Sequence, residues 1–228
     1  MNGKIITIEG TDCSGKETQS KLLYDKLIKD GIDVYRTSFP MYDTPTGRIV
    51  GGCYLGKEYL GEPYFEEGAN NVDYKVASLY FAADRRYNYL NILKKELEQG
   101  KTIILDRYIE SNMAHQGGKI LDDKKRYEAY KFLHKLEYEL LELPKPDITI
   151  FLYMPYEYSI KLRNNRNEKP DQHEMSVEHL KHAEIAYLEL EKIYAFERIN
   201  CVSNGIIRTP DEISEEVYTK VKRLIKKL

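Results

Sequence analysis

The sequence has few cysteines, no strong excess of one charge and no long hydrophobic run. Its formal net charge is −2, so the chain as a whole lacks the electric field that binds duplex nucleic acid or an anionic membrane. The three cysteines, Cys13, Cys53 and Cys201, are widely spaced and include no Cys-x-x-Cys pair. This spacing argues against a disulfide framework and against a zinc knuckle, and we expect reduced thiols.

The apolar runs are all shorter than the roughly 20 residues that cross a bilayer, and the first is wrongly flanked for a signal peptide. We therefore expect a cytoplasmic protein with neither membrane nor nucleic-acid partners. The 228 residues are 42% hydrophobic and 32% charged. They suit one compact domain, because single cores stop growing near roughly 250–300 residues. The prediction is a single domain over residues 1–228.

Short strand-like runs alternate along the chain with longer segments of helical periodicity. The strand-like runs are Lys4–Glu9, Asp33–Phe39, Thr102–Asp106, Asp147–Tyr153 and Arg198–Val202. The helical segments are Gly15–Asp30, Val72–Glu98, Lys124–Leu143, Ser176–Tyr194 and Pro210–Lys227. Such alternation is typical of parallel sheets. The predicted fold class is α/β, a doubly wound five-stranded parallel sheet with helices on both faces and the active site at the carboxyl ends of its strands.

Two stretches fit neither pattern. Pro40–Asn71 is rich in glycine and tyrosine, and Arg163–Gln172 is charged, rich in asparagine and poor in apolar residues. Loops of this length inside a compact domain often carry ligand contacts. We predict that both are substrate loops without regular structure.

The first strand-like run leads into the loop GTDCSGK at Gly10–Lys16, and an amphipathic helix follows. Phosphate binding needs glycines that let backbone N–H groups curl around oxygens, a helix N-terminus, and a lysine that reaches the β- and γ-phosphates. The loop supplies all of these directly after a buried strand, so we predict a P-loop that binds ATP. The predicted ATP-binding residues are Gly10, Asp12, Cys13, Ser14, Gly15, Lys16, Glu17 and Thr18.

The residue after Lys16 departs from the usual P-loop, in which a Ser or Thr hydroxyl binds Mg²⁺. Here that residue is Glu17, and Thr18 follows it. Three alternatives remain open. The carboxylate ligates Mg²⁺, a basic residue holds the carboxylate away, or Mg²⁺ is bound through waters and nucleotide phosphates alone.

The third strand-like run ends at Asp106, and Arg107 follows. An acid at the carboxyl edge of a parallel sheet can hold Mg²⁺ or its waters. An arginine beside it can bind a phosphate through two parallel hydrogen bonds. We predict that Asp106 is a metal ligand and that Arg107 binds phosphate.

The segment from Asp106 to Gly118 resembles the DRY/H-x-x-S…Q-G-G segment of thymidylate kinases. Further blocks in the family's order are Ile8–Gln19, Phe39-Pro40, Tyr80–Arg85 and the charged segment near Arg163. Together the blocks cover nearly the whole chain. The resemblance implies an enzyme that transfers the γ-phosphoryl group of ATP to dTMP with Mg²⁺. It also implies a homodimer, for which apolar surface within Val72–Leu97 is the expected interface.

The same resemblance implies roles for individual side chains. Asp12 would contact the 3′-hydroxyl of dTMP, Phe81 would stack on thymine, and Arg85 would hydrogen-bond the base. Without the resemblance, an aromatic residue such as Phe81 in an amphipathic helix would be assigned to packing.

Other implied contacts lie in the Asp-Arg block. Arg107 would hold the substrate phosphate, with Ser111 and Asn112 near the thymine edge. His115 would lie near the sugar, where its ring disfavours a 2′-hydroxyl; a hydrogen-bonded surface or core histidine is the alternative. The implied substrate-binding set is Asp12, Phe39, Pro40, Phe81, Arg85, Arg107, Ser111, Asn112, His115 and Gln116.

Phosphoryl transfer needs in-line positioning and positive charge around the equatorial oxygens, because the acceptor phosphate is already ionised at neutral pH. Arg163–Gln172 is predicted to be a lid that excludes water from ATP. Some family members carry a catalytic Arg in the P-loop where this sequence has Cys13, so we expect the lid to supply that cation. The predicted catalytic residues are Lys16, Arg107, Arg163 and Arg166, with Lys169 as a further donor.

Two rival functions share parts of this pattern. Another P-loop kinase would act on a purine nucleotide, a deoxynucleoside or a non-nucleotide alcohol, but the block with Phe81 and Arg85 argues against it. A GTPase-type switch would carry an Asn-Lys-x-Asp guanine box, which the sequence lacks. A purely structural protein would leave the P-loop, the Asp-Arg pair and the charged segment without a shared reason.

Overall fold

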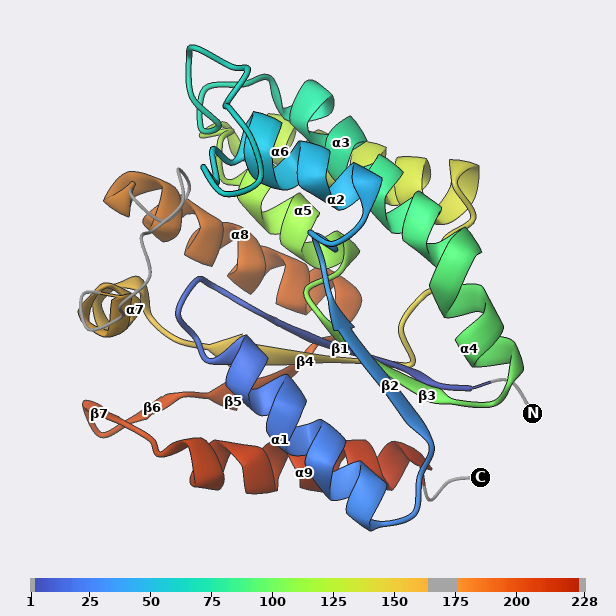
Figure 1. The fold of residues 1–228 in the computed structure, drawn as a ribbon. Coiled ribbons are helices and arrows are strands. Elements are labelled where there is room, and N and C mark those ends of the chain that lie inside the picture. The colour runs from blue at the N-terminus through green and yellow to red at the C-terminus, as the bar shows by residue number, and fades with distance from the viewer. Residues whose placement is uncertain (1–2, 164–175, 226–228) are drawn as a thin grey trace.

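The computed structural model describes residues 3–163 and 176–225, and its centre is a parallel sheet of five strands (Figure 1). The strands are β1 (Ile5–Gly10), β2 (Val34–Ser38), β3 (Thr102–Asp106), β4 (Ile148–Tyr153) and β5 (Glu197–Asn200). Their order across the sheet is β2-β3-β1-β4-β5, and the paired strands are parallel. The carboxyl ends of β1 and β3 are therefore neighbours, so the two predicted motifs begin side by side.

The apolar residues of the central strands divide between the two faces of the sheet. Ile6 and Ile8 of β1 belong to one buried cluster, and Ile5 belongs to another. In β3, Ile104 joins the first cluster and Ile103 the second. Successive side chains of a strand point to opposite faces. A continuous apolar run therefore marks a strand that is buried on both faces.

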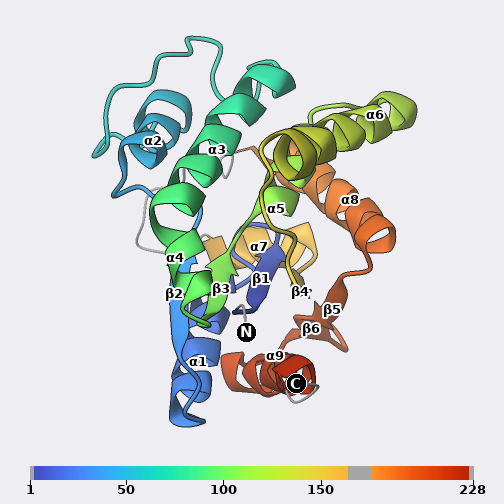
Figure 2. The same cartoon turned by 90° about the vertical axis from the view of Figure 1, so that its right-hand side faces the viewer.

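Two helices cover one face of the sheet, below it in Figures 1 and 2. They are α1 (Lys16–Lys29) and α9 (Pro210–Ile225), which contact each other. Leu23 and Val217 are buried between these helices and the sheet, in the cluster of Ile6. This packing holds the first turn of α1, and with it the end of the predicted phosphate loop, against the sheet.

The other face carries most of the remaining helices (Figures 1 and 2). The helices of this layer are α3 (Tyr74–Asn88), its continuation through the π-helical segment η2 (Tyr89–Leu93) into α4 (Lys94–Glu98), α5 (Ile109–Gly117), α6 (Asp123–His134) with its π-helical continuation η3 (Lys135–Leu140), and α8 (Val177–Tyr194). Helix α7 (Tyr156–Arg163) follows β4 and contacts α8. Helix α5 contacts α3, α6 and α8, so it lies at the centre of this layer.

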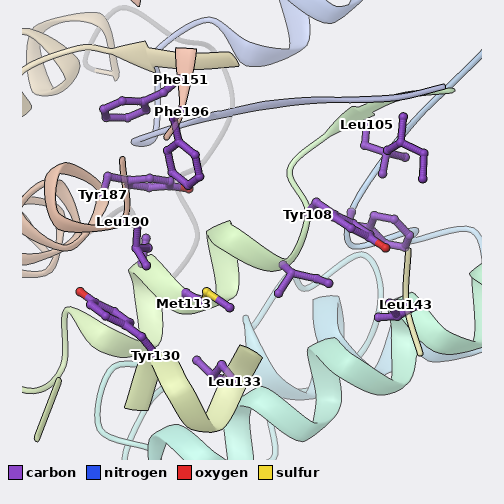
Figure 3. Close-up of a cluster of buried hydrophobic side chains, with 14 of the residues drawn as sticks. Leu105, Tyr108, Met113, Tyr130, Leu133, Leu143, Phe151, Tyr187, Leu190 and Phe196 are labelled. Atoms are coloured by element: carbon purple, nitrogen blue, oxygen red, sulfur yellow. The ribbon is translucent and has the colours of Figure 1, made fainter. Parts of the chain in front are cut away.

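A large aromatic and aliphatic cluster fills the space around α5 (Figure 3). Phe151 of β4, Tyr187 of α8 and Phe196 lie together beside the sheet, with the rings of Phe151 and Tyr187 stacked at 5.4 Å between centroids. Met113 of α5 and Leu133 of α6 lie on the outer side of the same cluster (Figure 3). The cluster fixes α5 relative to the strand ends, where the predicted site lies.

The predicted five-stranded parallel sheet and the five predicted helical segments are confirmed, with small differences at their ends. The last strand ends at Asn200, and Val202 instead begins a two-residue antiparallel pairing of β6 (Val202–Ser203) with β7 (Ile206–Ile207). None of the helices within residues 3–163 and 176–225 has the length and apolar character of a membrane span.

The prediction that Pro40–Asn71 has no regular structure is wrong in part. The stretch contains α2 (Pro45–Arg48) and the π-helical segment η1 (Ile49–Tyr54). The helix begins there because the side chain of Thr44 accepts a hydrogen bond from the backbone N–H of Gly47 and so caps the first turn.

Helix α5 was not predicted, although it carries four of the expected substrate-binding residues. Each of its nine residues is buried. A helix that is buried all round has no polar face, so its sequence shows no 3.6-residue alternation of polar and apolar positions. The sequence showed the motif that begins at Asp106, but it gave no sign of the helix.

Candidate active site

The loop between β1 and α1 has the backbone geometry of a phosphate-binding loop. Gly10 has φ +154°, and a Cβ atom at this position would lie 2.6 Å from the carbonyl oxygen of Leu152. Gly15 has φ +88° and precedes α1 without a side-chain cap. The first N–H groups of α1 are therefore left for a ligand, as anion binding at a helix N-terminus requires.

Lys16 is buried within this loop. Its Nζ donates a hydrogen bond of 2.7 Å to the carbonyl oxygen of Thr11 and lies 3.5 Å from Oγ of Ser14. The pKa of Lys16 is lowered to about 8, chiefly by burial and next by the nearby Arg107 guanidinium, whereas Asp12 and other acids oppose the shift. The ammonium group is thus held where phosphate oxygens would enter the loop.

Arg107 joins the phosphate loop to α5. Its backbone has φ +68°, which turns the chain sharply from β3 toward the helix. One terminal nitrogen, Nη2, forms an ion pair with the carboxylate of Asp12. The other, Nη1, lies 3.4 Å from Oγ of Ser111 and 3.3 Å from Nε2 of His115. The two sequence motifs are therefore in direct contact.

Asp106 lies at the end of β3 beside this pair. Burial raises the pKa of Asp106, whereas the charges of Lys16 and Arg107 lower it. No residue in the described part of the chain donates a hydrogen bond to its carboxylate, which is 7% exposed. A buried carboxylate without a donor is a suitable partner for a cation or its waters.

The residues that the structure describes form no complete protein cage for a metal. Within residues 3–163 and 176–225, no three His, Cys, Asp or Glu side chains are grouped to hold an ion. Glu17 is exposed on the first turn of α1, and its charge is near enough to raise the pKa of Asp106. One or two carboxylates are what Mg²⁺ uses when it keeps several waters and binds substrate phosphates, so these residues fit that ion.

Arg107 is one of the residues that line a pocket beside the phosphate-binding loop. The pocket contains all ten predicted substrate-binding residues, together with three that the sequence did not indicate. The lining residues are Asp12, Phe39, Pro40, Tyr42, Leu55, Phe81, Arg85, Arg107, Tyr108, Ser111, Asn112, His115 and Gln116. A pocket that combines aromatic and apolar walls with a few polar groups suits a small organic ligand.

Arg85 is held at the bottom of the pocket by a buried acid. Its Nε and Nη2 donate hydrogen bonds of 2.5 and 2.7 Å to the two oxygens of Glu137, and both side chains are almost completely buried. The same carboxylate accepts a 3.0 Å hydrogen bond from Nδ2 of Asn112. That contact fixes the amide orientation, and Oδ1 of Asn112 is buried without a hydrogen-bond partner in the described part of the chain.

Gln116 has no protein partner for its side chain in the described residues. Both amide atoms, Oε1 and Nε2, are buried and without hydrogen bonds. Buried polar atoms of this kind are costly unless a ligand or water pairs with them. Gln116 and Asn112 therefore give the pocket polar groups that are unsatisfied before a ligand binds.

Helix α3 contributes Phe81 to the aromatic side of the pocket. Phe81 packs edge to face on Tyr54, with ring centroids 5.5 Å apart. Asp84, one helical turn further, accepts hydrogen bonds of 3.0 Å from the backbone N–H of Met41 and 2.9 Å from the hydroxyl of Thr46. These bonds hold the segment that contains Pro40 against the helix.

Several residues of this site were not predicted from the sequence. Tyr42 and Leu55 lie in the stretch predicted to be irregular, where no pattern marks individual positions. Glu9 is completely buried, and its carboxylate accepts hydrogen bonds of 2.6 Å from Ser111 and 3.0 Å from Tyr187. A glutamate within an apolar strand could have signalled this buried network, although not its partners.

The predicted lid is only partly covered by the structure. Arg163 is the last residue of α7. Arg166 and Lys169 lie outside the described residues, as does the rest of the predicted lid up to Gln172. Cys13 occupies the position in the phosphate loop where some family members have arginine, and it is half-buried with φ +59°.

Comparisons with known proteins point to one family. The sequence matches the family model described as thymidylate kinase over residues 8–206. It is 31% identical to the thymidylate kinase of Halothermothrix orenii, over 97% of this chain and 98% of that protein. It is 32% identical to a probable thymidylate kinase of Thermococcus kodakarensis, over 89% and 94% of the two chains. A solved structure of thymidylate kinase from Candida albicans is similar with a TM-score of 0.71 and 26% identity, covering 97% of this chain and 92% of that one.

The buried pair of Arg85 and Glu137 gives a prediction about stability. Replacing Glu137 with Gln leaves the Arg85 charge uncompensated in a buried site, so we expect the free energy of unfolding to fall by about 3 kcal/mol. Urea denaturation followed by circular dichroism measures this change. Glu139→Gln is the matched control, because Glu139 is 58% exposed and should alter stability by less than about 0.5 kcal/mol. Equal effects of the two substitutions would contradict the prediction.

Proposed function

The chain belongs to the thymidylate kinase family, whose reaction is the ATP-dependent phosphorylation of dTMP, and we propose how its residues carry out that reaction. The phosphate loop Gly10–Lys16 binds the phosphates of ATP, and the pocket beside Arg107 binds dTMP. The observation that carries this proposal is the convergence of all ten predicted substrate-binding residues on one pocket that adjoins the loop. Donor and acceptor phosphates would then meet beside Arg107.

Arg107 is proposed to hold the acceptor phosphate. Its guanidinium is fixed by Asp12, Ser111 and His115, and a fixed fork of N–H donors suits bidentate phosphate binding. The ion pair with Asp12 also brings that carboxylate to the pocket, where it can accept a hydrogen bond from the 3′-hydroxyl of the sugar. His115 lines the same end of the pocket, in keeping with the proposed contact to the sugar.

The base is proposed to bind against Phe81 with its polar edge toward Arg85 and Asn112. Nε and Nη2 of Arg85 donate to Glu137, and Nη1 donates a 3.4 Å hydrogen bond to the carbonyl oxygen of Tyr108. The second N–H of Nη1 is proposed to donate to O4 of thymine. Oδ1 of Asn112 can accept from N3–H, since its Nδ2 already donates to Glu137. Two adjacent groups of opposite polarity thus match the thymine edge.

The chemical step needs charge and alignment more than a general base. Lys16 would contact the transferred phosphoryl group from the loop, and Arg107 would face it from the acceptor side. Mg²⁺, when bound with ATP, neutralises charge on the β- and γ-phosphates, and Asp106 would hold the ion or its waters, with Glu17 as the second carboxylate. Arg163 and Arg166 stay predictions as donors of further positive charge.

The proposed partner is a second copy of the chain. Exposed apolar residues recur every three or four positions along α3 and η2, and so form one stripe. The stripe consists of Val76, Leu79, Ala83, Tyr87 and Leu90. An exposed apolar stripe of this kind can be buried against the same stripe of a second copy, and so it is suited to self-association. A cytoplasmic location is likewise proposed, in keeping with three free cysteines.

Base choice is the direct test of the proposed substrate. We expect dTMP to be the preferred acceptor in an ATP-consumption assay with purified protein. dCMP should be used up to about 10⁴-fold less well, because its N4 amine faces Arg85 and its N3 lacks the proton that Asn112 accepts. dUMP lacks only a methyl group, for which a preference of roughly 10- to 200-fold is attainable. Preference for dCMP, dAMP or dGMP would favour a different nucleotide kinase.

Lys16 gives a prediction about pH. Because its pKa is about 8 in the free enzyme, the ammonium group loses its proton as the pH rises above that value, and phosphate binding weakens. We expect kcat/KM for ATP to decrease above pH 8, approaching tenfold per pH unit. Lys16→Arg is the control, since a guanidinium stays charged. Its residual activity should be lower but level from pH 7 to about 9, and a decline parallel to the wild type would assign the titration to another group.

The proposed dimer interface is tested by placing a charged side chain within the apolar stripe. Leu79→Asp places a carboxylate within the proposed interface, so sedimentation velocity should show a monomer where the wild type is a dimer. Leu121→Asp is the control, because Leu121 is 71% exposed and lies between α5 and α6, outside the stripe. A monomeric wild type, or a Leu79→Asp variant that remains dimeric, would exclude this interface.

A further inference from the structure

Two histidines from different helices meet behind Arg107. His115 lies on α5, and His179 lies on the first turn of α8. Nδ1 of His115 is 3.1 Å from Nε2 of His179, the ring centroids are 5.3 Å apart, and the planes differ by 18°. If the two rings were stacked face to face, the distance between their centroids would be almost as short as the distance between their nearest atoms. These rings instead meet edge to edge and nearly in one plane, which is the geometry of a ring-to-ring hydrogen bond.

The direction of that hydrogen bond follows from Arg107. A guanidinium has only donors, and Nη1 of Arg107 lies 3.3 Å from Nε2 of His115. Nε2 must therefore carry a lone pair, which places the proton of the neutral His115 ring on Nδ1. Nδ1–H then donates to Nε2 of His179. The order of donation is Arg107 to His115 to His179.

The surroundings keep His115 neutral, so its partners decide its tautomer. The side chain is 8% exposed and that of His179 is 6% exposed. Burial lowers the pKa of His115 well below its ordinary value; Arg107, His179 and Lys16 lower it further, whereas Asp12 raises it. Tyr187 of α8 packs against the ring edge to face, at 6.1 Å between centroids.

We propose that His179 is a positioning residue for Arg107, acting through the tautomer of His115. The proposal rests on the function proposed above, in which Arg107 holds the acceptor phosphate. With an acceptor at position 179, Nε2 of His115 faces Arg107 as a lone pair and attracts Nη1. Without that acceptor, Nδ1–H of His115 is buried without the partner at position 179, which destabilises this tautomer relative to the one with its proton on Nε2, where the proton opposes the N–H groups of Arg107.

His179 is itself fixed by the start of α8. Its backbone N–H donates a 3.1 Å hydrogen bond to Oγ of Ser176, the residue that caps the helix. None of the residues that line the nucleotide pocket belongs to the described part of α8. The helix nevertheless contributes to the acceptor site through His179, and Tyr187 forms a second connection through its 2.8 Å contact with Ser111.

The kinetic test compares two substitutions at one position. His179→Gln keeps an acceptor near the place of Nε2, whereas His179→Leu keeps bulk without one. Loss of a single neutral hydrogen bond corresponds to about a 3- to 10-fold change. We therefore expect His179→Leu to lower kcat/KM for dTMP by about 3- to 10-fold with KM for ATP unchanged, and His179→Gln to restore most of the loss. His182→Leu, one turn further along α8, is the matched control and should behave as the wild type.

The tautomer is tested separately by NMR of protein labelled with ¹⁵N-histidine. The chain has five histidines, so single substitutions assign the signals. We expect His115 to carry its proton on Nδ1 in the wild type and in His179→Gln, and to shift toward Nε2–H in His179→Leu.

A proton on Nε2 in the wild type, or equal kinetics for His179→Gln and His179→Leu, would overturn the inference. The NMR measurement needs no turnover. Failure of the proposed function would appear as a wild type inactive toward dTMP, whereas failure of this inference would appear as the wrong tautomer in an active enzyme.

Discussion

The ion pair between Arg107 and Asp12 connects the two halves of the active site. It can form because β1 and β3 are adjacent and parallel, so the chain segments that leave their carboxyl ends meet at one edge of the sheet. Arg107 also meets Ser111 and His115 on α5. A guanidinium held by several partners points its remaining N–H groups in a fixed direction, and a phosphate anion then binds without a large loss of side-chain entropy.

Buried carboxylates orient the polar side chains that line the pocket. Glu137 binds Arg85 and Asn112, and Glu9 binds Ser111. Buried carboxylates of this kind are tolerated because several donors satisfy each of them. The donors are thereby oriented before a nucleotide arrives, and groups without protein partners, such as the amide of Gln116, are left for the ligand. In the proposed nucleotide pocket, groups oriented in this way would discriminate between bases, because a mismatched base leaves them unpaired.

Much of the fold and the kind of chemistry were predictable from the sequence, because their signals are local. Nearly continuous apolar runs predicted the central strands β1 and β3, since a strand buried on both faces needs them. The phosphate loop was predicted from Gly10, Gly15 and Lys16. Its backbone conformation and the position of its lysine depend on a short segment only, so they can be recognised in the sequence. The Asp106-Arg107 pair and the blocks around it predicted the family, which the comparisons confirmed.

The tertiary structure alone decided which buried side chains are partners. Glu137 lies 52 residues from Arg85, and His179 lies 64 residues from His115. Neither spacing follows a helical or strand period, because these contacts arise from packing between whole elements. Helix α5 was hidden for the same reason: with all of its residues buried, only its neighbours show which face each residue takes. The sequence by itself therefore determined the P-loop and the sheet, whereas packing around α5 determined the proposed nucleotide pocket.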